Sequence, residues 1–295
     1  MLHLAHGTPD FALPGREPAV RWNALLGETD LAAYEAVVVV SAHAASKDRV
    51  AILAGGAASP PLLHDYRGFD PTLADLGLET PAAPEELRAT LLTELGGLGL
   101  PVRDAPGLPL DHGVWVPLLG TFGPRLPVPV FSLGLPLHFP LERVREWGVR
   151  LAALPLRLLW IASGGIVHNL SALAWDEPHG PPYGWAHDFW TAVEEHLAAG
   201  QAEPLLHPWE LPGGSLAVPT REHYAPFVLA GGLAGRPLVP LASGFAYRSL
   251  SLEVLAGGGL ETTLRPPSAP RAHPERRPPL SPPSPHVDHP QRSHP

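Results

Sequence analysis

The sequence predicts an α/β protein, a single domain with a central, mainly parallel sheet flanked by helices. Short apolar runs rich in β-branched residues alternate along the chain with longer stretches of helical character. Runs that are apolar throughout are typical of strands buried on both faces, and their alternation with helices favours a parallel sheet. Ligands of such sheets bind beyond the carboxyl ends of the strands. We therefore expect a functional site, including any metal, at these strand ends.

Four apolar runs are the candidate strands. The first is residues 2–5, and the second, "YEAVVVVSAH" (34–43), contains four consecutive valines. "PVPVFSL" (127–133) and "LRLLWIAS" (156–163) have the same character. None of these runs approaches the roughly 20 apolar residues that cross a membrane as a helix. The sequence therefore predicts buried strands and no membrane partner.

Three longer stretches between and after these runs are candidate helices. "APEELRATLLTELGGL" (83–98) has early glutamates and a glycine-rich end, and "PLERVREWGVRLAAL" (140–154) follows the third strand. "GWAHDFWTAVEEHLAAG" (184–200) ends at Gly200, in the position of a helix C-cap. The order of strands and helices supports the α/β prediction.

Composition narrows the class of protein and of site. The chain has 295 residues, 45% of them hydrophobic and 17% charged, with a formal net charge of −9. The acidic balance gives no indication of a nucleic-acid or anionic-membrane partner. There are no cysteines, so any metal must be held by histidines and carboxylates. The N-terminus shows no charged segment followed by an apolar stretch, which predicts a cytoplasmic protein, either a monomer or a homo-oligomer.

The last 31 residues differ from the rest in composition. Residues 265–295 contain 11 prolines and 4 histidines, with many arginines and few large apolar side chains. Such a segment cannot bury enough surface to offset its chain entropy, so we expect a disordered tail. This leaves residues 1–264 as the predicted catalytic domain.

Three of the apolar runs lead to a histidine. His6 follows "LHLA", His43 follows "VVVVSA", and His168 follows "LLWIASGGIV". A single histidine after a strand is most often a hydrogen-bonded core or surface residue. Three in the same topological position can instead converge on one point at the edge of a parallel sheet. From the pattern alone both interpretations stay open.

Two further segments carry histidines beside acidic residues. "LPLDHGVWVPL" (108–118) places His112 next to Asp111, with Gly113 for a close backbone approach and Trp115 as an aromatic wall. An aspartate can fix the tautomer of a histidine where the two side chains meet. The alternative is a histidine in an ordinary turn.

The second segment, "VPTREHYAPFVLAGGLAG" (218–235), contains Glu222 and His223 before an apolar run suited to a helix. Thr220 is a candidate N-cap, which would place both residues in the first helical turn. There, Glu222 could simply complement the helix dipole.

Six ordered motifs together resemble a known family. "AHGTPDFAL", "VVVVSAH", "HDYRGFD", "LDHGVWVPL", "SGGIVHNL" and "PTREHYAPFVLAGG" are similar to those of the class III extradiol ring-cleavage dioxygenases, most of all the DOPA-dioxygenase-like branch. The resemblance runs through residues 2–252 in order. It implies a non-haem enzyme that inserts O₂ into a catechol-type ring, such as that of DOPA, caffeate or protocatechuate, and opens it.

The resemblance also implies a set of metal ligands. His6 in "HGTP" and His43 in "SAH" correspond to family ligands, and His223 in "TREHY" matches the third ligand of the DOPA-dioxygenase-like branch. In the protocatechuate-type branch the third ligand is a glutamate, so Glu222 remains a competitor. The implied metal is Fe(II), whose binding by three ligands on one face leaves positions for the substrate and O₂. Zn²⁺ can be bound by the same side chains.

Further residues receive roles in the reaction. His168 in "SGGIVHNL" corresponds to an active-site histidine, either an acid–base group or an additional metal ligand, and His112 in "LDHG" lines the substrate site. Phe69 and Trp115 are candidate substrate-binding residues. Ala44 departs from the family, which usually has an aromatic residue after "SAH". Two alternatives remain: a zinc-dependent hydrolase built on the same histidines, and a non-catalytic Memo-like binding protein on the same fold.

Overall fold

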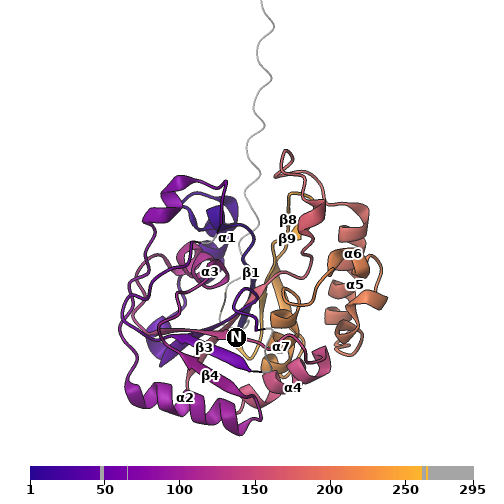
Figure 1. The fold of residues 1–295 in the computed structure, drawn as a ribbon. Coiled ribbons are helices and arrows are strands. Elements are labelled where there is room, and N and C mark those ends of the chain that lie inside the picture. The colour runs from indigo at the N-terminus through magenta and orange to yellow at the C-terminus, as the bar shows by residue number, and fades with distance from the viewer. Residues whose placement is uncertain (47–49, 65, 261–263, 265–295) are drawn as a thin grey trace, which may run out of the picture.

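The fold is described from a computed structural model covering residues 1–46, 50–64, 66–260 and 264. These residues form one α/β domain, a large sheet with helices on both faces (Figure 1). In this part of the chain no helix combines the length and the apolar character needed to cross a membrane. The proline-rich tail predicted for 265–295 lies outside the described residues, so its disorder and the domain boundary at 264 stay predictions.

The elements alternate as the sequence predicts. The strands are β1 (Leu2–Ala5), β2 (Ala36–Ser41), β3 (Ala51–Gly55), β4 (Val102–Ala105), β5 (Val130–Gly134), β6 (Leu158–Gly164), β7 (Val239–Ala242), β8 (Phe245–Ala246), β9 (Leu250–Ser251) and β10 (Val254–Ala256). The α-helices are α1 (Glu17–Leu26), α2 (Glu85–Gly97), α3 (His112–Phe122), α4 (Leu141–Leu151), α5 (Gly184–Ala198), α6 (Gly214–Ala217) and α7 (Ala225–Ala234). All four predicted strands and the three predicted helices at 83–98, 140–154 and 184–200 are present.

The main sheet has eight strands in the order β4-β3-β5-β2-β6-β1-β10-β7. Its centre, β5-β2-β6-β1, is parallel throughout. Antiparallel pairs flank this centre, β3 with β5 on one side and β1 with β10 on the other. The prediction of a mainly parallel sheet is therefore confirmed for the strands that carry the candidate histidines.

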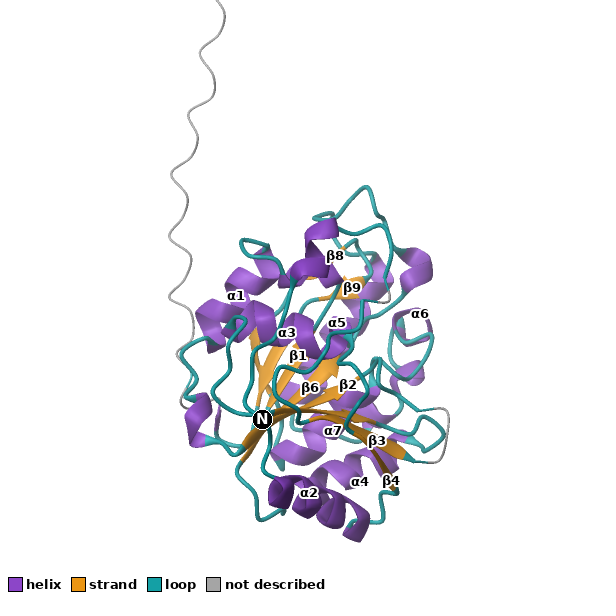
Figure 2. Ribbon diagram, turned by 60° about the vertical axis from the view of Figure 1, so that its left-hand side comes forward, coloured by secondary structure: helices purple, strands orange, loops and turns teal. Residues whose placement is uncertain are grey.

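Burial on both faces explains why β2 is a run of valines. Val37 and Val39 belong to the core on one side of the sheet, and Val38 and Val40 to the core on the other. Each such side chain contributes about 1.5–3 kcal/mol by leaving water. Helices α1 and α3 cover one face, while α2, α4 and α7 cover the other (Figure 2). The sheet is thus sandwiched, and its strand ends are the natural position for a site.

The start of α7 differs from the prediction. The helix begins at Ala225, after Tyr224 as N-cap, so Thr220 does not cap it and Glu222 and His223 precede it. Pro226 explains this start, because a proline without an N–H fits only the first turn of a helix. The hydroxyl of Thr220 instead donates to the Glu222 carboxylate.

Candidate metal centre

The three strands that lead to histidines are neighbours, and they end level with one another. β6 lies between β2 and β1 in the sheet. Ser41 at the end of β2 is in register with Ser163 of β6, and Ala5 at the end of β1 is in register with Gly164. The residues that follow therefore leave the same edge of the sheet, so the shared-site interpretation of the histidine pattern is the one the fold supports.

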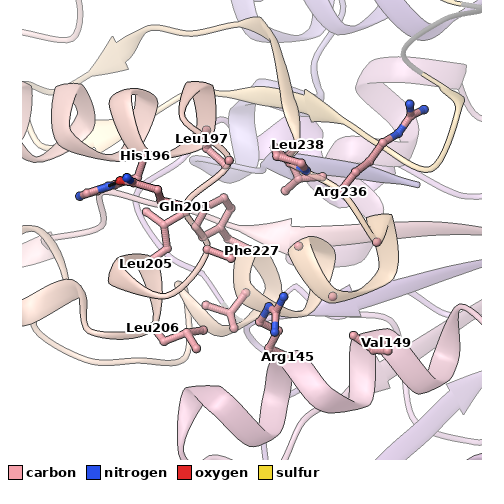
Figure 3. A pocket seen from close by; sticks show the side chains of 17 residues that line it. Arg145, Val149, His196, Leu197, Gln201, Leu205, Leu206, Phe227, Arg236 and Leu238 are labelled. Atoms are coloured by element: carbon pink, nitrogen blue, oxygen red, sulfur yellow. Dashed lines mark hydrogen bonds between the residues drawn. The ribbon is translucent and has the colours of Figure 1, made fainter.

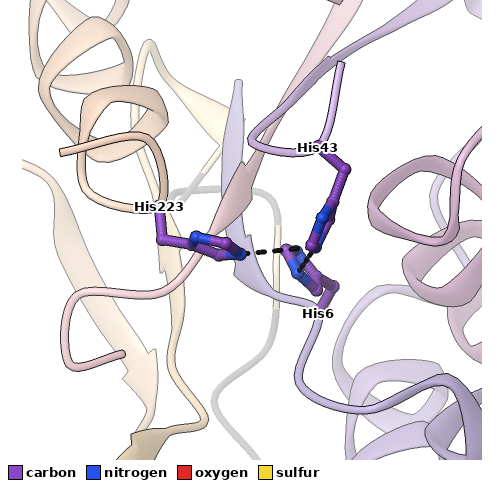
Figure 4. Close-up of side chains that lie close together, drawn as sticks. All are labelled: His6, His43 and His223. Carbon is purple, nitrogen blue, oxygen red and sulfur yellow. Dashed lines mark hydrogen bonds between the residues drawn. The ribbon is translucent and has the colours of Figure 1, made fainter. Parts of the chain in front are cut away.

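His6, His43 and His223 point their ring nitrogens at one another (Figure 4). The Nε2 atom of His43 lies 3.0 Å from Nε2 of His6 and 3.3 Å from Nε2 of His223. One nitrogen from each ring fits within a span of 4.8 Å. His6 and His223 are buried, whereas His43 keeps an edge open to solvent. The cluster is therefore enclosed by protein at His6 and His223 and open to solvent at His43.

This donor set fits a metal cation. Burial and the neighbouring imidazoles lower the pKa of His6 well below 6.5, and the same causes lower the pKa of His43. The rings of His6 and His43 are therefore neutral near pH 7, and a neutral imidazole has one N–H and one lone pair. Three inward-facing nitrogens cannot all be satisfied by hydrogen bonds among themselves. A divalent cation accepts all three lone pairs at once, as in the three-ligand sites of non-haem iron and catalytic zinc enzymes.

A hydrogen-bond chain fixes which nitrogen of His6 faces the cluster. Pro117 stands inside α3 and has no N–H, so the carbonyl of Gly113, four residues earlier, lacks its helical partner. The Ser163 hydroxyl donates to that carbonyl. Since its only proton is used there, Ser163 must accept from Nδ1 of His6, 3.0 Å away. Nε2 of His6 then carries the lone pair that a metal needs.

Glu222 lies beside His223 and not among the inward-facing nitrogens. Its Oε1 atom is 3.5 Å from Nδ1 of His223, on the other side of that ring from Nε2. Desolvation raises the pKa of Glu222, but the contacts with His223 and Thr220 outweigh it and lower the pKa to about 2. The carboxylate is therefore ionised and placed to polarise His223. This geometry favours His223 over Glu222 as the third ligand.

His168 and His112 complete a group of five histidines. The ring of His168 stacks on that of His223, with centroids 3.5 Å apart and planes 5° from parallel. His112, the first residue of α3, lies 3.8 Å from His43 between ring centroids. Burial, with the neighbouring His223, lowers the pKa of His168 well below 6.5, so this ring is unprotonated at neutral pH. His168 is not among the three residues whose nitrogens converge.

The loop that carries His168 is held at every residue. The backbone N–H groups of residues 165–169 each donate to a different acceptor. In order, the acceptors are the carbonyl of His223, Oε1 of Glu253, Oγ of Ser251, the carbonyl of Ala217 and the carbonyl of Ser249. The segment that includes β9 and leads to β10 thus supplies three of the five acceptors. A loop fixed in this way places its histidine with little freedom.

Of the two glycines before His168, Gly164 is needed for space. A side chain at Gly164 would collide with the carbonyl oxygen of His223. Neither Gly164 nor Gly165 adopts a positive φ, so Gly164 serves a close backbone approach and not a left-handed turn. Gly113 is similar, because a side chain there would collide with the Ser41 hydroxyl. These small residues let the segments carrying His43, His112, His168 and His223 meet.

The two predicted substrate-binding aromatics occupy different surroundings. Trp115 is fully buried, and its indole N–H donates to the carbonyl of Leu63. Phe69 is half-buried, 5.8 Å from Tyr66 and 6.2 Å from Trp175 between ring centroids. Trp115 therefore packs in the core one helical turn after His112. Its ring centroid lies 6.0 Å from that of Tyr66, so Trp115 is the buried end of an aromatic group that reaches the surface at Phe69. Contact of either ring with substrate stays a prediction.

One buried pair was not foreseen from the sequence. His3 and Glu253 are both fully buried, and Nε2 of His3 lies 2.9 Å from Oε1 of Glu253. The same oxygen accepts the N–H of Ile166 in the His168 loop. The only local signal is a polar residue inside each of two apolar runs, "LHLA" and "LEVLA". Their 250-residue separation hides the pairing.

Comparison with known proteins agrees with this geometry. Residues 28–237 match a family model described as the catalytic LigB subunit of aromatic ring-opening dioxygenase. A 4,5-DOPA dioxygenase extradiol of Escherichia coli is 34% identical over 260 residues, covering 85% of this chain and 92% of the relative. A 4,5-DOPA dioxygenase extradiol of Beta vulgaris is 28% identical over 238 residues, with 79% and 85% covered.

A solved structure has a similar fold. The crystal structure of an uncharacterised protein from Escherichia coli K12 superimposes with a TM-score of 0.66 at 28% sequence identity. The match covers 86% of this chain and 97% of that one. The similarity thus extends through the strands and loops that bring the histidines together.

Proposed function

Because the chain belongs to the LigB family of aromatic ring-opening dioxygenases, in its DOPA-dioxygenase-like branch, we propose that it cleaves a catechol-type ring with Fe(II) held by His6, His43 and His223. The family makes it an oxidoreductase that opens aromatic rings. The observation that carries the metal proposal is the convergence of three ring nitrogens, with the pKa of His6 and of His43 lowered below 6.5. Three ligands on one side leave the other side for a catechol and O₂.

The protein's own groups supply order and proton transfer. When bound, Fe(II) provides the redox chemistry that joins O₂ to the ring. His168 is neutral and held rigidly, so an imidazole nitrogen of this residue can take a phenolic proton as the catechol binds and return a proton later. His112, whose ring lies against that of His43 at a tilt of 43°, is placed to orient the catechol oxygens. A direct contact of His168 with the metal, as an additional ligand, stays a prediction.

The substrate is proposed to be a substituted catechol of the DOPA, caffeate or protocatechuate type. Ala44 is consistent with space for a substituent on the catechol, because this small side chain follows His43 at a position where the family usually has an aromatic ring. The family assignment favours this activity over the two alternatives, a zinc hydrolase and a Memo-like binding protein. Zn²⁺ remains a competitor of Fe(II) for the same nitrogens. The protein is further proposed to be cytoplasmic and to act on a small molecule, without a nucleic-acid partner.

The test is an oxygen-uptake assay on protein loaded anaerobically with Fe(II). A panel of catechols, caffeate-like acids and DOPA should give, with at least one member, equimolar O₂ uptake and a yellow ring-opened product. Zn²⁺-loaded protein and the His43→Ala variant serve as controls and should give neither. If Fe(II)-loaded protein forms no product with any catechol of the panel, the proposed activity is wrong.

A further inference from the structure

A cavity lies among α4, α5, α7 and the loop after α5, and none of the five clustered histidines lines it (Figure 3). Its volume is about 350 Å³, within the range of small-molecule sites. The cavity lies on the face of the sheet that α2, α4 and α7 cover. It is therefore a candidate binding site separate from the metal centre.

The walls of this cavity are mainly apolar. Leu197, Leu205, Phe227 and Leu238 contribute buried side chains. On α7 the wall has a gap at Gly231, where a Cβ atom would meet no other heavy atom within 4 Å. Open space next to apolar side chains is the setting that accepts an aromatic or aliphatic group.

One cation faces this apolar space without a counter-charge. Arg145 of α4 is half-buried, and Figure 3 shows its guanidinium directed to the side of the cavity where Phe227 lies. Within the described residues no carboxylate pairs with Arg145. Other arginines of the same helix are satisfied: Arg143 donates to Glu146 at 2.7 Å, and Arg150 donates to the Leu98 carbonyl at 2.9 Å. A half-buried guanidinium beside an apolar hollow favours an anionic partner that brings its own apolar body.

The remaining polar groups of the cavity do not compete for this role. The guanidinium of Arg236 points away from the cavity in Figure 3. His196 and Gln201 lie at the rim and are hydrogen-bonded to each other, with Nδ1 of His196 2.8 Å from Oε1 of Gln201. Arg145 is therefore the group that would define the polar end of a ligand.

We infer that this cavity is a binding site for a small monocarboxylate with an apolar body, such as an arylalkanoate. The carboxylate pairs with the Arg145 guanidinium, whose planar fork matches two oxygens. The apolar body fills the space between Phe227 and Gly231. The site is independent of the dioxygenase activity, because its residues include none of the clustered histidines.

Calorimetric titration of the full-length protein with 4-phenylbutyrate and with the uncharged 4-phenylbutan-1-ol tests this inference. The acid should bind at least about tenfold more tightly than the alcohol, since only the acid forms the charge-assisted pair with Arg145. Arg145→Gln should remove that preference and leave weak binding of both. Gly231→Leu should fill the cavity and remove both, and Arg143→Gln is the matched control on α4 that should change neither.

Binding that persists unchanged in Gly231→Leu and in Arg145→Gln would place the ligand elsewhere, and the inference would fail. It would fail equally if the wild-type protein bound no 4-phenylbutyrate. Neither result depends on iron or on ring cleavage, so this test and the oxygen-uptake assay can fail separately.

Discussion

His3 and His6 are three residues apart on one strand and its end, yet they are built for different tasks. Both are buried, with 0% and 1% of their surface exposed. His3 faces the carboxylate of Glu253, which also holds the backbone of the His168 loop. His6 faces the Ser163 hydroxyl on one side and two other imidazoles on the other. The same residue type in the same sheet thus has one environment with a carboxylate and one without.

This difference shows that the partner of a buried imidazole decides its role. The Glu253 carboxylate accepts from Nε2 of His3 within the protein, so His3 can serve as a structural link. Nitrogens that meet only other nitrogens lose protons and keep lone pairs, so His6 is suited to bind a cation. The comparison predicts that changes around His6 affect chemistry and changes around His3 affect stability.

The largest effect is expected for His6→Ala. Removing one of three converging nitrogens should abolish stoichiometric Fe(II) binding and reduce ring cleavage to background, while the metal-free protein keeps its fold. The paired variant is His3→Gln, whose side-chain amide can still donate to Glu253. It should bind Fe(II) and retain most of its turnover per folded molecule. Metal analysis after desalting, together with circular dichroism, measures both, and equal loss of metal in the two variants would remove the distinction.

His168→Ala should separate proton transfer from metal binding. The three-nitrogen set lacks His168, so Fe(II) should still bind. Loss of the proton-transfer group should lower kcat by about 10²–10⁴-fold. Full turnover by this variant would assign the proton transfer to another group, with His112→Ala as the next variant to measure.

Glu253→Ala should act mainly on stability. It leaves two buried donors, His3 and the N–H of Ile166, without their shared acceptor, and each unsatisfied donor costs about 1–3 kcal/mol. The free energy of unfolding of the metal-free protein, from urea titration, measures this loss. Glu253→Gln keeps an acceptor oxygen and should lose less. A loss below about 1 kcal/mol, the size expected of a surface pair, in Glu253→Ala would contradict the structural role.

Ser163→Ala tests the chain from Pro117 through Gly113 to His6. Without the hydroxyl, Nδ1 of His6 loses its acceptor and the ring is no longer fixed in the tautomer that presents Nε2. Loss of such a partner typically weakens metal binding by about 10–100-fold. A competition titration with a metal-binding dye measures the affinity, and an unchanged value would show that the tautomer needs no such support.

The smallest effect is the pH dependence of the metal-free protein. The pKa of His6 is lower in the folded protein than the ordinary value of 6.5. At a pH between the two pKa values, the unfolded chain therefore binds one proton more than the folded protein. Stability must then fall as the pH drops below about 6.5, by up to about 1.4 kcal/mol per pH unit for this group. Urea titrations at pH 7.5 and 5.5 on wild type and His6→Asn check it. An equal slope in the two proteins would count against it.

Much of the fold was predictable because its signals are local. The apolar runs of β1, β2, β5 and β6 identify the centre of the sheet, and three of the helices lie where helical stretches were expected. Helix α3 is harder to predict, since Pro117 stands inside it. The start of α7 was predicted wrongly because Thr220 pairs with Glu222 and not with the helix.

The site divides in the same way. His6, His43 and His168 follow strands, so topology alone brings them to one edge. His112 and His223 were placed there by the family resemblance, and their approach depends on glycines that make room for backbone. Contacts such as His3 with Glu253, or Ser163 with the Gly113 carbonyl, join residues 250 and 50 positions apart. No local pattern reports such pairs, because they exist only once the sheet has formed.

Crystallography of the Fe(II)-loaded protein with anomalous scattering at the iron edge tests the central claim most directly. One iron per chain is expected, bonded to Nε2 of His6, His43 and His223, with Glu222 beside Nδ1 of His223 and not bonded to the iron. Iron bound through the Glu222 carboxylate, or at a position away from these three rings, would contradict it.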